Sequence, residues 1–131
     1  MEQYNEKIGT RKDLVSYRIE TAKSDLKSAK ILLNAGEYKG ANNRAYYAIF
    51  HAINAVHALD GRAFKRHKDY VKTAIFPREV GRKIGEAEEI RHASDDDDFY
   101  IASKEETERQ NAVAGEFIEL VEKYCMVHNL S

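Results

Sequence analysis

The sequence predicts an all-α protein, an up-and-down bundle of long helices with a shorter helical segment inserted between the second helix and the last one. The 131 residues include one proline and seven glycines, too few for the turns that an all-β sandwich or barrel needs at about every 8–12 positions. Apolar residues recur at helical spacing along most of the chain. The content of 43% hydrophobic and 33% charged residues is typical of a globular domain and not of a disordered segment. We therefore expect a single helical domain over residues 1–131.

The first helix is predicted to begin near Thr10 or Asp13 and to end at a stop signal around Gly36. Its apolar residues form one stripe at steps of four and three, which consists of Val15, Ile19, Ala22, Leu26, Ala29 and Leu33. Such a stripe marks the face that a helix buries. Charged residues between the members of the stripe are expected to face water, and they are Arg18, Lys23, Asp25, Lys27 and Lys30.

The second helix is predicted from about Gly40 to Asp60, and three kinds of face run along it. One stripe of mostly small residues would let another helix approach closely: Ala41, Ala45, Ala48, Ala52, Ala55 and Leu59. Beside it runs a stripe of larger apolar residues: Tyr46, Ile49, Ile53 and Val56. The third face is polar and holds Arg44, Tyr47, His51 and Asn54. A helix that is apolar on two sides is expected to be the central helix of the bundle.

Shorter elements are expected between the second helix and the last. The stretch 61–67 is interpreted as a basic loop, and a short helix from about Lys68 to Phe76 follows it. This helix would end before Pro77, because proline disfavours helical geometry in the preceding residue. A further helix is predicted from about Val80 to His92, and its inward positions are Val80, Ile84 and Ala87. The acidic run Asp95–Asp98 is expected to interrupt it, since like charges repel.

The last helix is predicted to open with the capping box Ser103–Glu106 and to run to about Val127. Its expected core face consists of Val113, Phe117, Leu120 and Tyr124. Cys125 is the one cysteine of the chain, and a small buried hydrophobe is a better interpretation of it than a nucleophile.

Charge and cysteine content limit the classes of function. A net charge of −1 argues against a strongly basic nucleic-acid binder, yet the charges are segregated. Residues 62–83 hold eight basic and two acidic residues, whereas residues 86–108 hold ten acidic and two basic ones. These blocks indicate either faces of opposite potential or solvated helix faces. A lone cysteine, a polar N-terminus and the absence of an apolar run of about 20 residues favour a cytoplasmic protein with no role at a membrane.

Arg44 and His51 form the candidate catalytic pair. Seven residues are nearly two helical turns, so both side chains share a face and their Cα atoms lie about 10 Å apart. An arginine binds phosphate with a bidentate fork, and an imidazole with an ordinary pKa near 6.5 exchanges protons at neutral pH. In metal-free RNA cleavage, His51 would deprotonate a ribose 2′-OH and Arg44 would stabilise the charge on phosphorus. The alternative is an arginine and a histidine that hydrogen-bond within a polar seam between helices.

Four parts of the chain resemble HEPN domains: Asn43–Ala52, Phe64–His67, Arg91–Tyr100 and the capped last helix. The similarity covers about residues 14–124, taken as the core of the domain, and it points to the small stand-alone members of that superfamily. HEPN domains are helical bundles, usually dimeric, and many are metal-independent ribonucleases with four to six residues between an arginine and a histidine. Arg44 and His51 have six between them. The resemblance thus implies a homodimer in which two such motifs face each other, with no metal or cofactor.

The resemblance also implies a biological role and partners. The protein would be the endoribonuclease toxin of a toxin–antitoxin system, with RNA as its substrate and a minimal nucleotidyltransferase as its neutralising partner. Tyr47 and Asn54 would orient either His51 or the RNA. Arg66 and His67 of the basic loop would bind RNA phosphates, unless they are simply solvated.

Two positions depart from the family pattern. Ala45 follows the arginine where active HEPN ribonucleases commonly carry a polar residue. Ile53 stands where some HEPN toxins carry a tyrosine that the partner modifies with AMP, so no such modification is expected at this site. Many members of the superfamily are also non-catalytic. The alternative is a HEPN module that binds a nucleotidyltransferase partner or a nucleotide and cleaves nothing.

The remaining candidates are weaker. Arg91 and His92 are adjacent, and neighbouring residues on a helix point about 100° apart, so no shared role is expected. Tyr46 is expected in the core, while core packing and stacking on a base are both open for Tyr47. The run Asp95–Asp98 would suit a divalent cation by its charge, but a solvated run or an electrostatic contact with a basic partner is the simpler interpretation.

Overall fold

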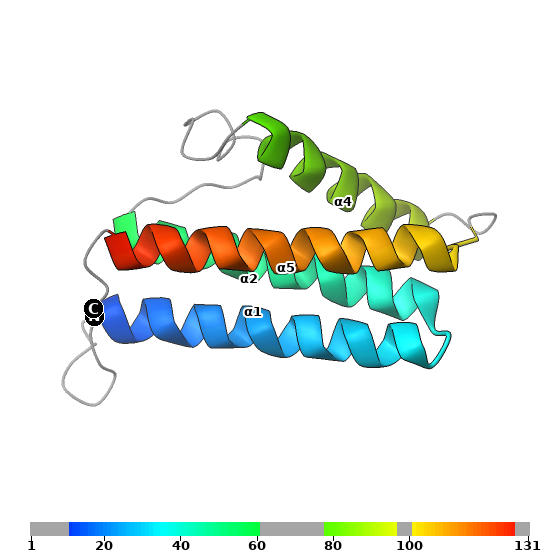
Figure 1. The fold of residues 1–131 in the computed structure, drawn as a ribbon, viewed down its shortest axis with the longest axis horizontal. Helices are drawn as coiled ribbons and strands as arrows, with labels where there is room; N and C mark the ends of the chain where they lie inside the picture. Colours follow the sequence, from blue (N-terminus) through cyan, green and yellow to red (C-terminus); the bar gives the residue numbers. More distant parts are fainter. Residues whose placement is uncertain (1–10, 61–77, 97–100, 128–131) are drawn as a thin grey trace.

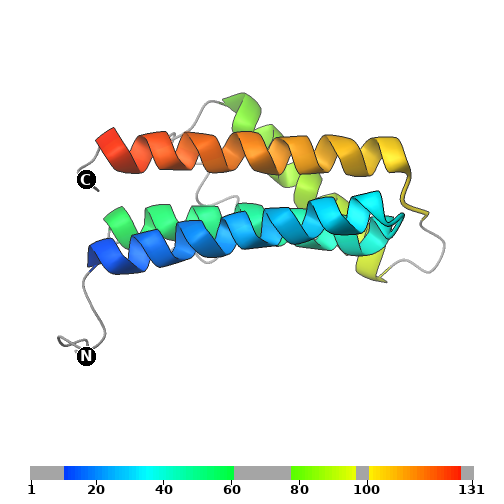
Figure 2. The same cartoon turned by 60° about the horizontal axis from the view of Figure 1, so that its bottom comes forward.

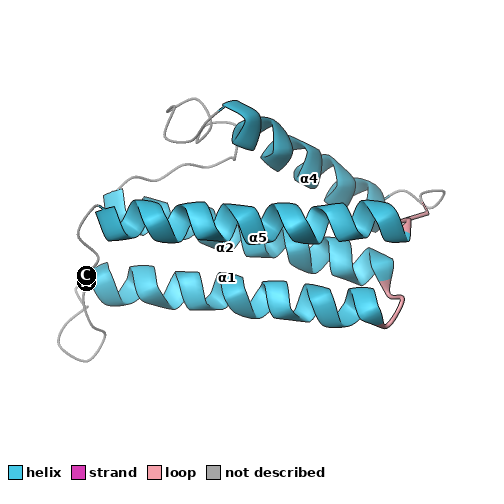
Figure 3. Ribbon diagram, in the orientation of Figure 1, coloured by secondary structure: helices cyan, strands magenta, loops and turns pink. Residues whose placement is uncertain are grey.

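The computed structural model describes residues 11–60, 78–96 and 101–127. Its elements are α1 (Arg11–Asn34), α2 (Tyr38–Asp60), α4 (Arg78–Asp96) and α5 (Lys104–Val127). Figures 1 and 3 show that they run up and down in turn, so the predicted all-α bundle is confirmed for the described residues. The short helix predicted for residues 68–76 lies outside these residues.

A tight turn joins α1 to α2. Gly36 has φ = 81°, a left-handed conformation that glycine adopts without the penalty of a Cβ atom. The amide of Gly36 donates to the carbonyl of Leu33 at 3.0 Å, and the amide of Glu37 donates to the carbonyl of Leu32 at 2.8 Å. These two bonds form a Schellman motif. The predicted stop signal therefore ends α1 at Asn34, and α2 begins at Tyr38, two residues earlier than expected.

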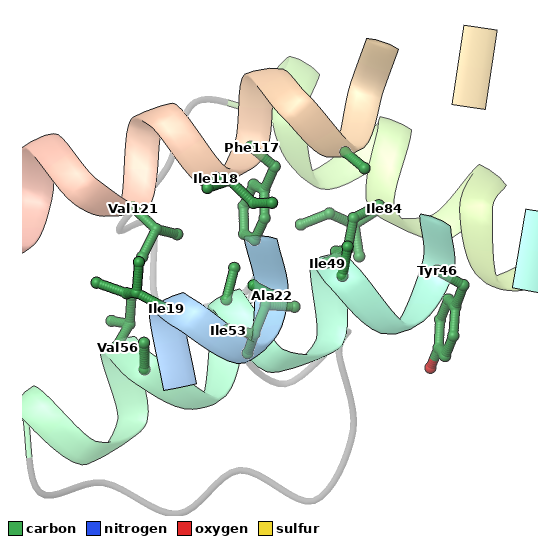
Figure 4. Packing of buried hydrophobic residues seen from close by; sticks show 14 of the residues in the cluster. Ile19, Ala22, Tyr46, Ile49, Ile53, Val56, Ile84, Phe117, Ile118 and Val121 are labelled. Carbon is green, nitrogen blue, oxygen red and sulfur yellow. The ribbon is translucent and has the colours of Figure 1, made fainter. Parts of the chain in front are cut away.

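Helix α2 is the central helix of the described bundle, as its sequence predicts. It packs against α1, α4 and α5, and Figure 4 shows its isoleucines between side chains of the other helices. The core contains both of its apolar stripes, with the five alanines, Tyr46, Ile49, Ile53 and Val56 all buried. A helix buried on two sides leaves one narrow strip for polar residues, so packing alone selects where a site on α2 can lie.

The inclination of α4 distinguishes it from the other three helices, which run nearly along one direction (Figures 1 and 2). The expected inward residues Ile84 and Ala87 are buried, and they dock α4 mainly on α2. The side chain of Val80 lies outside the described residues. The helix continues to Asp96, so it ends within the acidic run and not before it.

The N-terminus of α5 is capped as predicted. Ser103 Oγ accepts a hydrogen bond from the amide of Glu106 at 3.0 Å, and the carbonyl of Ser103 accepts one from the Thr107 hydroxyl at 2.8 Å. A serine cap of this kind satisfies one of the amides that the first turn leaves unpaired.

The predicted core face of α5 is correct at Phe117 and wrong in its centre. Its buried apolar residues are Ala114, Phe117, Ile118, Val121 and Cys125. Val113 and Tyr124 lie at the edge of the core, and Leu120 is half-buried. Helix α5 packs against both α1 and α2. The buried face of α5 is rotated about the helix axis by about 100°, the angle between adjacent residues, from the face that the sequence predicts. Cys125 is fully buried, as expected of a structural cysteine.

None of the helices in ranges 11–60, 78–96 and 101–127 combines the length and the apolar composition that a membrane span needs. In the same ranges, no three histidine, cysteine or carboxylate side chains gather in a way that would hold a metal ion.

Candidate functional site

The polar face of α2 forms a strip that is partly open to solvent. Its residues, at steps of three and four, are Arg44, Tyr47, His51 and Asn54. The side chain of Arg44 is 36% exposed and that of His51 is 27% exposed. Tyr47 and Asn54 are also half-buried. A ligand in solution can therefore reach the strip, and the buried parts of the same side chains are packed against neighbouring residues.

Asp25 of α1 joins the two predicted catalytic residues. Its Oδ1 accepts a hydrogen bond from Arg44 Nη1 at 3.0 Å, and its Oδ2 lies 3.4 Å from His51 Nε2. The Asp25 side chain is only 14% exposed, so the carboxylate acts in a medium of lower dielectric constant than water. One carboxylate thus fixes the spacing and orientation of both groups.

The prediction that Asp25 faces water is wrong. Asp25 is one turn from Ala22 and one turn from Ala29, both of which are fully buried. Residues three and four apart lie next to each other on a helix surface, so Asp25 flanks the buried stripe. This spacing was the available signal, but only the docking of α1 on α2 shows that the carboxylate meets the strip.

His51 is poised in its neutral form. Partial burial lowers the pKa of His51 below its usual value, and the positive charges of Arg18 and Arg44 lower it further. The negative charge of Asp25 opposes this shift but does not overcome it. Since an ordinary histidine already titrates near 6.5, the imidazole is mostly uncharged at neutral pH. It is therefore in the state that accepts a proton.

Aromatic side chains support the imidazole on its own helix. The ring centroid of His51 lies 5.6 Å from that of Phe50, edge to face, and 6.4 Å from that of Tyr47. Tyr47 also meets Tyr46 edge to face at 5.4 Å. Such pairs prefer defined orientations, so the aromatic cluster of α2 restricts how the His51 ring can turn. Phe50 was not among the predicted site residues.

Arg91 of α4 reaches the same aromatic cluster. Its Cζ atom lies 4.9 Å from the ring centroid of Tyr46 and 5.9 Å from that of Tyr47. Arg44 Cζ lies 5.0 Å from the centroid of Tyr47. The Tyr47 ring therefore has two guanidinium groups within the range of cation–π attraction. Helical periodicity does not connect Arg91 with the strip, since the two are 37 or more residues apart along the chain.

The structure places the other candidate residues in different environments. Tyr46 is buried, as predicted, with 7% exposure, and burial raises the pKa of its hydroxyl to about 12. Asn54 lies on the strip one turn beyond His51. Arg66 and His67 lie outside the described residues. The His92 ring is closer to Arg91 than the angle between adjacent residues suggests, with Nδ1 at 3.4 Å from Arg91 Nη2.

Comparison with known proteins identifies the relatives of this chain. Residues 15–124 match the model of the HEPN domain family. A UPF0332 protein of Thermotoga maritima is 26% identical over 124 residues, which cover 88% of this chain and 94% of that protein. A protein of Methanocaldococcus jannaschii with the name "Putative toxin MJ0142" is 28% identical over 120 residues, which cover 86% of this chain and 82% of that protein.

Proposed function

The chain belongs to the HEPN domain family, and from this premise we propose that it is a toxin-like, metal-independent endoribonuclease that acts through Arg44 and His51. The observation that carries the proposal is the Asp25 carboxylate, which holds the guanidinium and the imidazole together on one half-exposed strip. The name of the archaeal relative supports the toxin-like part. The family supports the choice of RNA as substrate.

In the proposed reaction His51 is the general base. The neutral imidazole takes the proton from a ribose 2′-OH, and the 2′-oxygen forms a bond to the adjacent phosphorus. The bond from phosphorus to the 5′-oxygen breaks, and that oxygen takes a proton from solvent. The products are a 2′,3′-cyclic phosphate and a new 5′-hydroxyl. The lowered pKa of His51 keeps the base available at neutral pH.

Arg44 is the proposed ligand of the scissile phosphate. The guanidinium carries five N–H donors, and the hydrogen bond to Asp25 is made through Nη1. The remaining donors can meet the phosphate oxygens as negative charge grows on them. Such fixed donors are worth about 3–4 kcal/mol in comparable sites. Asp25 is a positioning residue that orients both partners and does not itself touch the RNA.

A cleavage assay in EDTA tests the proposal. Purified protein should cut RNA to products with 2′,3′-cyclic phosphate ends, and His51→Ala and Arg44→Ala should each lower the rate by about 100-fold or more. Arg109→Ala is the matched control, because Arg109 is an exposed residue of α5 and lies off the strip, and it should retain the activity. Equal cleavage by His51→Ala and the unchanged protein would exclude His51 as the base.

The same proposal includes the assembly and partner that the family resemblance implies. Two protomers would bring their strips face to face, and a minimal nucleotidyltransferase would neutralise the toxin. Co-expression with a nucleotidyltransferase should restore growth to cells that produce this protein and should yield a complex on purification. Growth arrest that no nucleotidyltransferase relieves would contradict the assigned partner.

One observation favours the non-catalytic alternative. Asp25 pairs with both Arg44 and His51 within one chain, as a polar seam between helices would. A module of this kind would bind a partner or a nucleotide and would cleave no RNA. This alternative predicts that Arg44→Ala weakens the complex with the partner. It also predicts that neither the unchanged protein nor any variant cleaves RNA in the assay.

A further inference from the structure

We propose that Arg91 of α4 is a second phosphate ligand, and that with Tyr47 it extends the Arg44/His51 site to a subsite for the adjacent nucleotide of a single-stranded RNA. The inference rests on RNA as the ligand of the proposed function. In this arrangement one phosphate meets Arg44, the base beside it stacks near Tyr47, and the next phosphate meets Arg91.

The packing of α4 on α2 sets the position of Arg91. Residues 84, 87 and 91 follow one another at steps of three and four, so they share a face of α4. Ile84 and Ala87 of that face are buried in the core. Arg91 is the next member of the series, half-buried at the edge of the core. The contacts that dock α4 on α2 therefore also place the Arg91 guanidinium beside the aromatic residues of α2.

Tyr47 links the two arginines. Its ring centroid lies 5.0 Å from Arg44 Cζ and 5.9 Å from Arg91 Cζ. The ring is half-buried, so part of it faces solvent. Proteins that bind single-stranded nucleic acid commonly combine cationic groups that follow the backbone with an aromatic ring that stacks on a base. The trio Arg44, Tyr47 and Arg91 has this composition, supplied by two helices.

The Tyr46 ring, which lies nearest to Arg91, carries no negative charge that would repel an anion. Burial and the nearby Glu88 raise the pKa of Tyr46 to about 12, against the opposing effect of Arg91. Its phenol therefore stays neutral at physiological pH and does not repel a phosphate.

Binding of uncleavable RNA to the full chain tests the subsite. The probe is a fluorescent pentanucleotide with 2′-O-methyl riboses, which lack the attacking hydroxyl, and affinity is measured at several salt concentrations. Arg91→Gln should weaken binding about tenfold and should reduce the slope of log K against log salt by about 0.7, the value for one phosphate of a single strand. A nucleoside monophosphate, which reaches one guanidinium, should bind the variant and the unchanged protein equally.

Further variants separate a phosphate contact from a structural role. Arg91→Lys keeps the charge and should keep the salt slope, even though it loses the fork geometry. Tyr47→Leu should weaken binding without changing the slope, because it removes stacking and no charge. Arg109→Gln, an exposed arginine of α5, is the matched control and should behave as the unchanged protein. Thermal unfolding shows whether each variant is folded.

The outcomes distinguish this inference from the proposed ribonuclease activity. A folded Arg91→Gln variant with unaltered affinity and salt slope would overturn the subsite, even if the protein cleaves RNA. RNA binding that depends on Arg91 without any cleavage would sustain the subsite and contradict the ribonuclease. A protein that binds no pentanucleotide at all would overturn both.

Discussion

Three side chains from two helices decide what chemistry is available at the residue scale. His51 alone would be an ordinary imidazole with a pKa near 6.5. Burial against α1 and the aromatic cluster lowers that pKa, and Asp25 limits the shift. Arg44 shares the same carboxylate. The site therefore combines an imidazole of lowered pKa with a cation that one acidic residue holds in place.

Substitution of Asp25 tests this balance. Asp25→Asn removes the one negative charge that raises the pKa of His51, so the pKa should fall further, by an amount that NMR titration of the imidazole measures. A base must be neutral to act, so the acidic limb of the pH–rate profile should move to lower pH. The maximal rate should also fall, because the orienting contacts are lost.

A conservative variant separates orientation from charge. Asp25→Glu keeps the carboxylate, so the pKa of His51 should stay nearer its original value than in Asp25→Asn. Identical His51 titration curves for Asp25→Asn and the unchanged protein would show that the carboxylate does not act on the imidazole.

At the scale of the element, α2 is defined by how closely its neighbours approach. The five alanines of its small stripe are all buried, so α2 itself places only methyl groups between its backbone and the residues that pack there. This close packing holds the strip at fixed positions relative to Asp25 of α1 and Arg91 of α4. The positions of the site residues therefore depend on the buried alanines, which have no reactive or polar side-chain group.

An overpacking variant tests the role of the small stripe. Ala48 is fully buried, and Ala48→Leu should destabilise the protein by about 1–3 kcal/mol. The melting temperature should fall by roughly 3–12 °C for a chain of this size, as followed by circular dichroism. Ala112→Leu places the same side chain at an exposed position of α5 and should leave the melting temperature nearly unchanged. Equal effects of both variants would contradict close packing at Ala48.

At the scale of the whole molecule, the arrangement of the four described helices explains why the strip is accessible. Helix α2 buries its other faces against α1, α4 and α5, and the strip is the part that these neighbours leave partly open. The proposed homodimer would place a second strip opposite the first. The assembled particle should then have a mass near twice 15.0 kDa, which sedimentation equilibrium measures.

A charge placed on the strip tests where the protomers meet. Asn54→Arg should shift the equilibrium toward the monomer, since each interface would contain two added positive charges. Ala112→Arg adds the same charge on the exposed face of α5 and should leave the dimer intact. A protein that sediments as a monomer at every concentration would contradict the dimer and with it the face-to-face arrangement of the strips.

The sequence by itself determined the four described helices, the central place of α2 and the face of α2 that Arg44 and His51 share. These features are local, because helical spacing, capping residues and turn glycines act over a few positions along the chain. Tertiary structure alone decided which residues join that pair. Asp25 is 19 residues before Arg44 and Arg91 is 40 residues after His51, and helical periodicity does not say which faces of two helices meet. The same reason explains why the predicted core face of α5 was wrong. Helix α5 packs against both α1 and α2, and the face that it buries depends on the positions of both helices.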